Sequence, residues 1–244
     1  MRTTNQSLNN VEAESATTGL YRLGGVAALI AAGFAFIQIA IEFIGVGIMH
    51  IEIPTTILGW FMLLQNHWLL GLTALTLFQI PVFIFCIPVF QALYDALKQI
   101  NKALVTVSTV LAFLGIAIYI SSNTVFSMLS LSRQYAAATT EVQKSIFLAA
   151  GQAMLAIYEG VGVDIGLSLF MISILLVSGI MLRSEIFKRA SAYVGILAGV
   201  IVIAYYIVSA FTPQAIFILE IAGLFFVAWL ILVGQRLLQV RYRK

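Results

Sequence analysis

Charged residues are scarce in this sequence. Its 244 residues include 13 Lys and Arg and 10 Asp and Glu, so 9% are charged, whereas roughly a quarter are charged in soluble domains. Hydrophobic residues make up 61% of the chain, and the mean hydropathy is +1.04. The apolar residues fall in runs long enough to cross a bilayer. The scarcity of charge therefore excludes a water-soluble globule and predicts an integral membrane protein.

Cysteine and catalytic motifs are scarce as well. The single cysteine, Cys86, excludes an internal disulfide and a metal site built from several thiolates. The sequence has no nucleotide-binding loop, nucleophile elbow or serine, histidine and acid set, and we expect no cofactor. The net charge of +3 comes from basic residues that cluster at the ends of apolar runs, where they face lipid headgroups. We therefore expect the lipid bilayer as a partner and no nucleic acid.

Six apolar runs are long enough to be membrane spans, which need roughly 17 to 25 apolar residues. Their continuity favours helices, because a spanning helix satisfies its own backbone hydrogen bonds. The connections 50–67 and 134–158 are too short to span but apolar enough to lie in the interface as helices. The prediction is an all-α polytopic membrane bundle of six transmembrane helices, with two short interfacial helices in the outer loops. The runs are about 24–48, 68–94, 103–126, 160–182, 191–211 and 215–235.

Basic residues orient the predicted bundle, because Lys and Arg in short loops stay on the cytoplasmic side. With the N-terminus inside, the outer segments hold only Arg133 and Lys144. We predict a plasma-membrane protein with a polar cytoplasmic tail at 1–22, a transmembrane domain at 23–238 and a basic cytoplasmic tail at 239–244. Residues 1–22 lack the apolar segment of a signal peptide. The inner segments hold the other eleven basic residues: Arg2, Arg22, Lys98, Lys102, Arg183, Lys188, Arg189, Arg236, Arg241, Arg243 and Lys244.

Prolines and small residues indicate how the helices pack. Pro81 and Pro88 each remove a backbone hydrogen bond and predict a kink in the second run, with a broken helix lining a substrate path as the alternative. We expect Cys86, between them, to be buried. No inverted repeat of the secondary-transporter kind relates the two halves. Small residues allow close helix packing in lipid, and they form stripes on three runs: Ser108, Gly115 and Ser122; Gly162 and Gly166; Gly195 and Gly199.

Polar residues inside the spans are the functional candidates, because ionisable groups are costly in a membrane. The predicted topology collects carboxylates in the outer half of the bundle, with amides on neighbouring spans. In the structural alternative, Gln38 and Glu42 bond a neighbouring helix, while Glu159 and Glu220 reach interfacial water. The candidate polar pocket consists of Gln38, Glu42, Gln79, Asn123, Glu159, Asp164 and Glu220.

Two of these carboxylates, Glu42 and Asp164, are expected to face the bundle interior. No basic residue lies within a span to pair with them, so each needs hydration, a proton or a cation. Glu159 shares a heptad stripe with Gln152, Gly166 and Ser173, which favours an inward-facing Glu159. About 140° separates Glu159 from Asp164 around a helix, so the two need not face one cavity.

Several positions also resemble a known family. Glu42 and Phe43 lie near the end of the first span. Leu93 and Tyr94 precede Leu97 and Lys98, and Asn101 is followed by Leu104. Gly166, the segment 179–184, and Phe187 ahead of Gly195 continue the pattern. Over about residues 20–210 the chain resembles the multi-pass bacterial and archaeal membrane proteins grouped as domain of unknown function 4386. The resemblance implies membership of that family without naming an activity.

Three classes of function remain open. The outer carboxylates favour a binding or transport protein with an outward-facing pocket for a cation, proton or small polar solute. A non-catalytic partner, sensor or scaffold subunit is the first alternative. An intramembrane metal-dependent hydrolase that uses His50 and His67 is the second, although two histidines 17 residues apart match no zinc spacing. An enzyme is the least favoured class.

Overall fold

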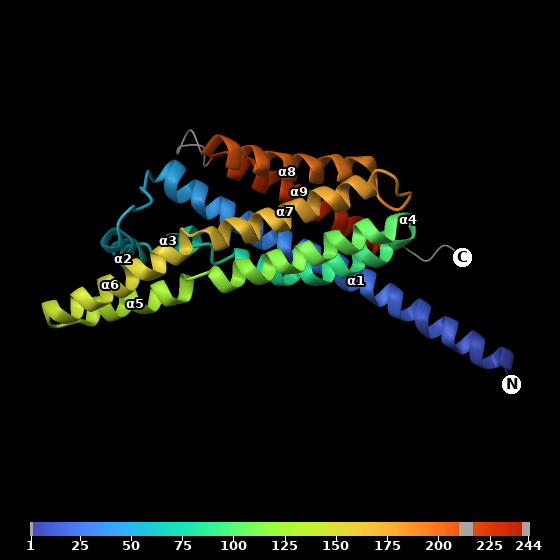
Figure 1. The fold of residues 1–244 in the computed structure, drawn as a ribbon, viewed down its shortest axis with the longest axis horizontal. Coiled ribbons are helices and arrows are strands. Elements are labelled where there is room, and N and C mark those ends of the chain that lie inside the picture. Colours follow the sequence, from blue (N-terminus) through green and yellow to red (C-terminus); the bar gives the residue numbers. More distant parts are fainter. Residues whose placement is uncertain (1, 210–216, 241–244) are drawn as a thin grey trace.

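A computed structural model describes residues 2–209 and 217–240, and the side chains of 17–209 and 218–240. Every regular element of these residues is a helix, which confirms the all-α prediction (Figure 1). The elements are α1 (Arg2–Glu42), the π-helical turn η1 (Phe43–Ile48), α2 (Ile57–Asn66), α3 (Trp68–Ala74), α4 (Gln79–Ser122), α5 (Val125–Ala137), α6 (Glu141–Tyr158), α7 (Val161–Met181), α8 (Arg189–Ser209) and α9 (Phe217–Gln239). The predicted polar tail is helical from Arg2 and continuous with the first apolar run.

Five helical segments of the described residues are long and apolar enough to cross a membrane. The predicted connection between the last two apolar runs lies outside the described residues. Three segments join more than one element, because α1 continues into η1, α4 into α5 and α6 into α7. The five are Thr17–Ile48, Gln79–Ala137, Glu141–Met181, Arg189–Ser209 and Ile218–Gln239.

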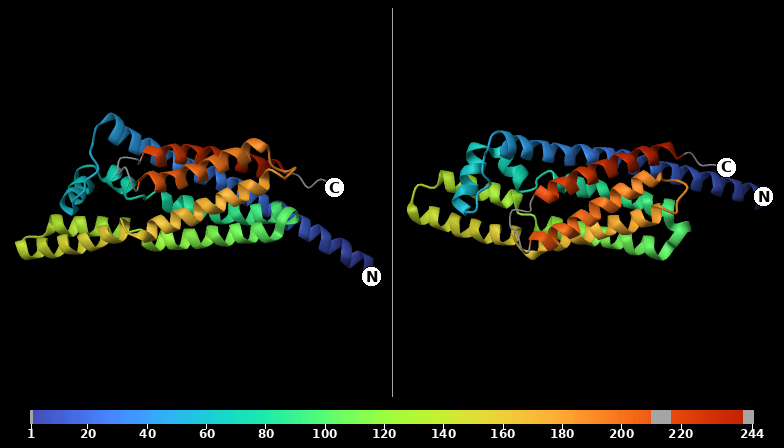
Figure 2. Two further views of the ribbon diagram at one scale, coloured as in Figure 1. Left: turned by 45° about the horizontal axis from the view of Figure 1, so that its top comes forward. Right: turned by 90° about the horizontal axis from the view of Figure 1, so that it is seen from above.

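Helix α4 reverses direction at Asn101, where the backbone leaves helical geometry with φ −155° and ψ 88°. The ring centroids of Phe83 and Tyr119 lie 4.6 Å apart, whereas a straight helix would separate these residues by about 54 Å. The arms 79–100 and 102–122 therefore lie side by side in antiparallel directions (Figure 2). The side chain of Asn101 accepts a hydrogen bond from the Leu104 backbone N–H at 3.0 Å, which caps the second arm.

The predicted second run, 68–94, is not one helix. The turn 75–78 divides it into α3 and the first arm of α4, and Thr76 in this turn has φ 61°. Pro81 lies in the first turn of α4, where the helix needs no N–H from it. Only Asn101 inside α4 has non-helical dihedral angles, although Pro88 also lies there. The break in this run therefore comes from a left-handed threonine and not from either proline.

The two predicted interfacial helices also differ in extent. Helix α2 occupies only part of 50–67, because it begins after Thr56, whose side chain accepts a hydrogen bond from the Gly59 backbone N–H. Where one short helix was expected over 134–158, α5 and α6 form a helical hairpin that extends along the long axis of the bundle (Figures 1 and 2).

Small residues hold the long helices together as predicted. A Cβ atom on Gly115 would lie 2.7 Å from the Gly166 carbonyl oxygen, and one on Gly195 would lie 2.5 Å from the Trp229 side chain. Ser108 donates a hydrogen bond to the Ser173 carbonyl oxygen at 2.8 Å. These contacts join α4 to α7 and α8 to α9. Cys86 is fully buried, as expected.

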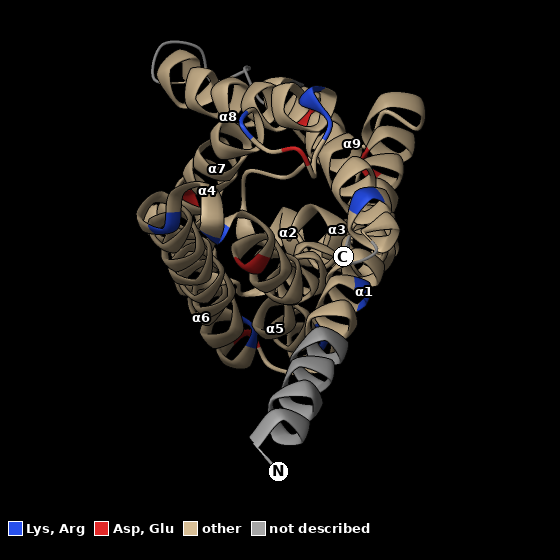
Figure 3. Ribbon diagram, turned by 90° about the vertical axis from the view of Figure 1, so that its right-hand side faces the viewer, with Lys and Arg blue, Asp and Glu red and all other residues tan. Residues whose placement is uncertain are grey.

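Basic residues gather at the end of the bundle that faces the viewer in Figure 3, which we call the basic end. This end carries the α4 turn, the α7–α8 connection and the last turns of α9. Arg236 donates a hydrogen bond across it to the Ile186 carbonyl oxygen. The opposite end carries η1, α2, α3, α5 and α6, with Arg133 and Lys144. The basic end comprises Arg22, Lys98, Lys102, Arg183, Lys188, Arg189 and Arg236.

Candidate polar site

Glu42 lies where α1 passes into the π-helical turn η1 at the opposite end. Gln38, one turn earlier, donates a hydrogen bond from Nε2 to Glu42 Oε1 at 3.3 Å. Both side chains are half-buried, and the Gln38 Oε1 atom is buried without a hydrogen-bond partner. The end of α1 thus presents one carboxylate and one unsatisfied carbonyl oxygen.

A second carboxyl group meets Glu42 from α9. The side chains of Glu42 and Glu220 interact directly, and we call them the carboxyl pair. The ion pairs among the described side chains are Lys98 with Asp95 and Lys144 with Glu141, so no described Lys or Arg neutralises the carboxyl pair. Two like charges at close range repel strongly in an apolar setting. The pair therefore requires a proton or a bound cation to be stable.

A group of hydroxyl and amide side chains adjoins the carboxyl pair. Asn123 Nδ2 donates to Thr76 Oγ1 at 3.0 Å, and the side chains of Tyr119 and Tyr158 lie beside Thr76. The Tyr158 hydroxyl also donates to the Ala74 carbonyl oxygen at 2.9 Å. Both tyrosines lie near Glu42. We call Thr76, Tyr119, Asn123 and Tyr158 the Thr76 cluster.

The structure thus brings together only part of the predicted pocket. Gln38, Glu42 and Glu220 meet, and Asn123 belongs to the adjoining Thr76 cluster. Gln79 is half-buried beside this cluster, where its backbone N–H donates to the Thr76 carbonyl oxygen at 3.2 Å. These five residues come from three separate helices, α1, α4 and α9, or from their immediate ends.

The expectation that Asp164 faces the bundle interior is wrong. Asp164 is exposed on α7, and its Oδ1 accepts a hydrogen bond from the Tyr206 hydroxyl of α8 at 3.3 Å. The packed face of α7 is set by Gly162 and Gly166, which contact the second arm of α4. Asp164 lies two residues from each glycine, about 160° to 200° around the helix, and is therefore turned away from that contact.

Glu159 is also exposed, so the heptad argument for an inward orientation is wrong. The helix does not continue through this position: α6 ends at Tyr158, and α7 begins at Val161. The break interrupts the stripe that would have aligned Glu159 with Gly166 and Ser173. Gln152, the first member of that stripe, is exposed on α6.

Three residues of the Thr76 cluster were not predicted as site residues. The sequence pattern could have indicated Tyr119, because it follows Gly115 by four residues on the packed face that also holds Ser108. Tyr158 reaches the cluster because α6 folds back beside α2 and brings the Tyr158 hydroxyl to the Ala74 carbonyl oxygen at the end of α3. Nothing in the sequence indicated a turn at Thr76, because a β-branched residue rarely adopts a positive φ and the turn around it has no Gly or Pro.

Metal ligands do not assemble among the described side chains. No group of three His, Cys, Asp or Glu residues comes together there. His50 and His67 are both exposed at the opposite end. The residues that the structure describes therefore provide no metal site for the hydrolase alternative.

Comparison with known families identifies the family of the chain. The family described as Domain of unknown function (DUF4386) matches residues 61–234, which is more than half of the sequence. The chain belongs to this family. No curated protein and no solved structure matches the sequence. The DUF4386 match includes the Thr76 cluster and Glu220 but begins after Glu42, whereas the resemblance was expected over about 20–210. The carboxyl pair thus joins one residue inside the matched range to one before it.

Proposed function

We propose that this DUF4386 protein binds a cation at the carboxyl pair, within a bundle of six membrane spans. The observation that carries the proposal is the meeting of Glu42 and Glu220 without a basic partner, beside the unsatisfied Gln38 Oε1 atom. Hard cations such as Na⁺ and Ca²⁺ favour carboxylate and carbonyl oxygens as ligands. A bound cation would offset the repulsion of the pair and satisfy the amide oxygen at once.

The reversal of α4 supports the six-span arrangement. Each arm of α4 holds about 21 residues, which at 1.5 Å per residue is about 30 Å, the thickness of a bilayer core. Counting the arms separately gives α1, two arms of α4, α7, α8 and α9. We propose that the basic end lies in the cytoplasm of the plasma membrane, because Lys and Arg favour that side. The carboxyl pair would then lie near the outer surface.

Single-cysteine labelling tests this orientation. In a Cys86→Ala background, cysteines replace Gln65, Gln99 and Gln134, all of which are exposed. An impermeant thiol reagent added to intact cells should label positions 65 and 134 and spare 99. Gln214, a further predicted outer position, lies outside the described residues and serves as an additional site. Labelling confined to position 99 would show that the orientation is the opposite of the one proposed.

Cation binding should stabilise the purified protein, because a ligand that binds only the folded state raises the free energy of unfolding. We expect thermal unfolding in detergent to shift upward when NaCl or CaCl₂ replaces choline chloride at constant ionic strength. At a cation concentration 100 times Kd the gain is about 2.7 kcal/mol. Glu42→Gln and Glu220→Gln should each remove the gain while keeping the side-chain shape.

Glu159→Gln and Asp164→Asn are the matched controls. Both remove an exposed carboxylate from the same end of the bundle and should keep the full cation response. An equal loss of response in all four variants would show a general charge effect and refute the site. The stability of the wild type could instead depend on pH but on no added cation, with this dependence lost in Glu42→Gln. That result would show that the carboxyl pair shares a proton and binds no cation.

A further inference from the structure

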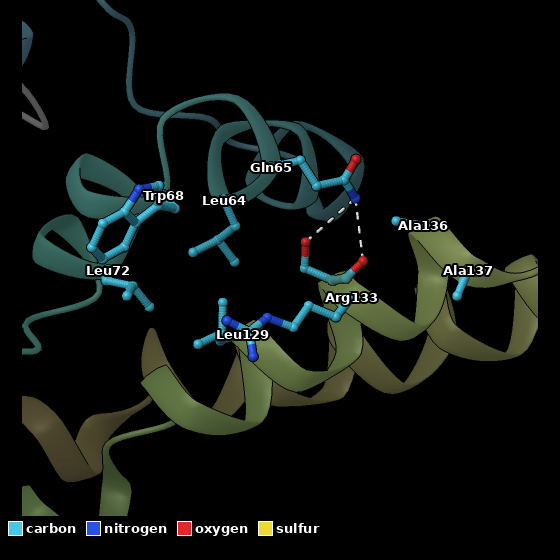
Figure 4. A pocket seen from close by; sticks show the side chains of 9 residues that line it. Leu64, Gln65, Trp68, Leu72, Leu129, Arg133, Ala136 and Ala137 are labelled. Atoms are coloured by element: carbon cyan, nitrogen blue, oxygen red, sulfur yellow. Dashed lines mark hydrogen bonds between the residues drawn. The ribbon is translucent and has the colours of Figure 1, made fainter.

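A groove lies between α2, α3 and α5 at the end opposite the basic end (Figure 4). Its volume is about 770 Å³, within the range of about 300 to 1,000 Å³ that ligand pockets occupy. Most of its surface comes from aliphatic side chains and Trp68, which is 60% exposed. The groove contains neither the carboxyl pair nor the Thr76 cluster, so what it binds is independent of the proposed cation site.

Hydrogen bonds hold the groove in shape. Gln65 Nε2 on α2 donates to the Ser132 carbonyl oxygen and hydroxyl on α5 at 3.2 and 3.4 Å. The Ser132 hydroxyl donates back to the Phe61 carbonyl oxygen at 3.1 Å. These bonds fix the distance between α2 and α5 on one side of the groove, as Figure 4 shows. The cavity is therefore formed before any ligand arrives.

Arg133 supplies the one positive charge among the residues that line the groove. Its side chain runs along α5 so that the guanidinium lies beside Leu129, below Leu64 (Figure 4). The guanidinium has no carboxylate partner among the described side chains, whose ion pairs lie elsewhere. An unpaired guanidinium next to an apolar channel fits a ligand with an anionic head and a hydrocarbon tail. The planar guanidinium binds phosphate through paired hydrogen bonds.

We infer that this groove binds an anionic phospholipid of the surrounding membrane. The phosphate of its headgroup pairs with Arg133, and one acyl chain lies along Leu64, Leu72 and Leu129. A headgroup with a single negative charge, as in phosphatidylglycerol, matches the single basic residue. Trp68 lies at the mouth of the groove and contacts the upper part of the chain, as amphipathic aromatic rings do at membrane interfaces.

Quenching of Trp68 fluorescence tests the inference, because the other tryptophans, Trp60 and Trp229, are buried. The protein is placed in phosphatidylcholine nanodiscs that contain a small fraction of lipid with brominated acyl chains, and the Trp68→Phe variant supplies the background signal. Brominated phosphatidylglycerol should quench Trp68 at about a tenfold lower lipid fraction than brominated phosphatidylcholine. Both lipids carry a phosphate, but the choline ammonium of phosphatidylcholine cancels its charge and repels Arg133, so the preference measures the net charge of the headgroup. A tenfold preference corresponds to about 1.4 kcal/mol.

Arg133→Gln should remove the preference, whereas Lys144→Gln, which removes the ion-paired basic residue of α6, should keep it. Ala136→Phe fills the groove without changing charge and should reduce quenching by phosphatidylglycerol to the phosphatidylcholine level. Ala149→Phe, on the exposed face of α6, is its control. Equal quenching of the wild type by both lipids would overturn the inference. Preferential quenching by a brominated fatty acid, with no response to phosphatidylglycerol, would also overturn it and assign a free carboxylate ligand.

Discussion

Gly166→Ala is expected to destabilise the folded bundle by about 1 to 3 kcal/mol, the usual cost of overpacking a tight contact. A Cβ atom at this position would lie 2.7 Å from the Tyr119 backbone nitrogen and 2.9 Å from the Gly115 carbonyl oxygen. Both neighbours are backbone atoms, so no side chain can rotate away and the two helices must move apart. Equilibrium unfolding in mixed detergent micelles measures the loss.

Gly179→Ala is the control for this prediction, because Gly179 lies on the same helix with nothing within 4 Å of its added Cβ. Alanine is a better helix former than glycine by about 1 kcal/mol, so this variant should be as stable as the wild type or more stable. The two substitutions are chemically identical and differ only in what the new methyl group meets. Equal effects would mean that α4 and α7 do not pack as described.

Glu220→Lys is expected to replace the bound cation with a covalently attached one. The lysine ammonium can reach Glu42, since the residue it replaces already contacts that carboxyl group. In choline chloride the variant should be more stable than the wild type by about 1 to 3 kcal/mol, the upper value being the cost of one uncompensated charge at the centre of a membrane. Adding NaCl or CaCl₂ should then give no further stabilisation.

Glu159→Lys provides the comparison, because it makes the same charge change at an exposed position. This variant should match the wild type in choline chloride and should still be stabilised by added cations. A Glu220→Lys protein that keeps the wild-type cation response would contradict the carboxyl pair as the binding site. Thermal unfolding of the three proteins in parallel supplies the measurement.

The sequence alone determined the membrane class, the helical fold and the small-residue contacts. Each of these depends on local properties, such as the hydropathy of a run or the spacing of Gly162 and Gly166. A helix in lipid needs no distant partner for its backbone hydrogen bonds, so its presence can be inferred from its own residues. The same argument located Cys86 correctly in an apolar interior.

Only the tertiary structure decided which polar residues meet. Glu42 and Glu220 lie at opposite ends of the sequence, and no local pattern indicates that α1 and α9 are neighbours. Asp164 was predicted to face the bundle interior because a carboxylate within a span is costly. Helix α7 packs through its glycine face, however, and Asp164 lies on the opposite side of the helix. Thr76 broke an apolar run through a left-handed backbone that no composition signal marks. Whether a segment forms a helix depends on its own residues. How that helix is rotated and which helices it contacts depend on packing across the whole bundle.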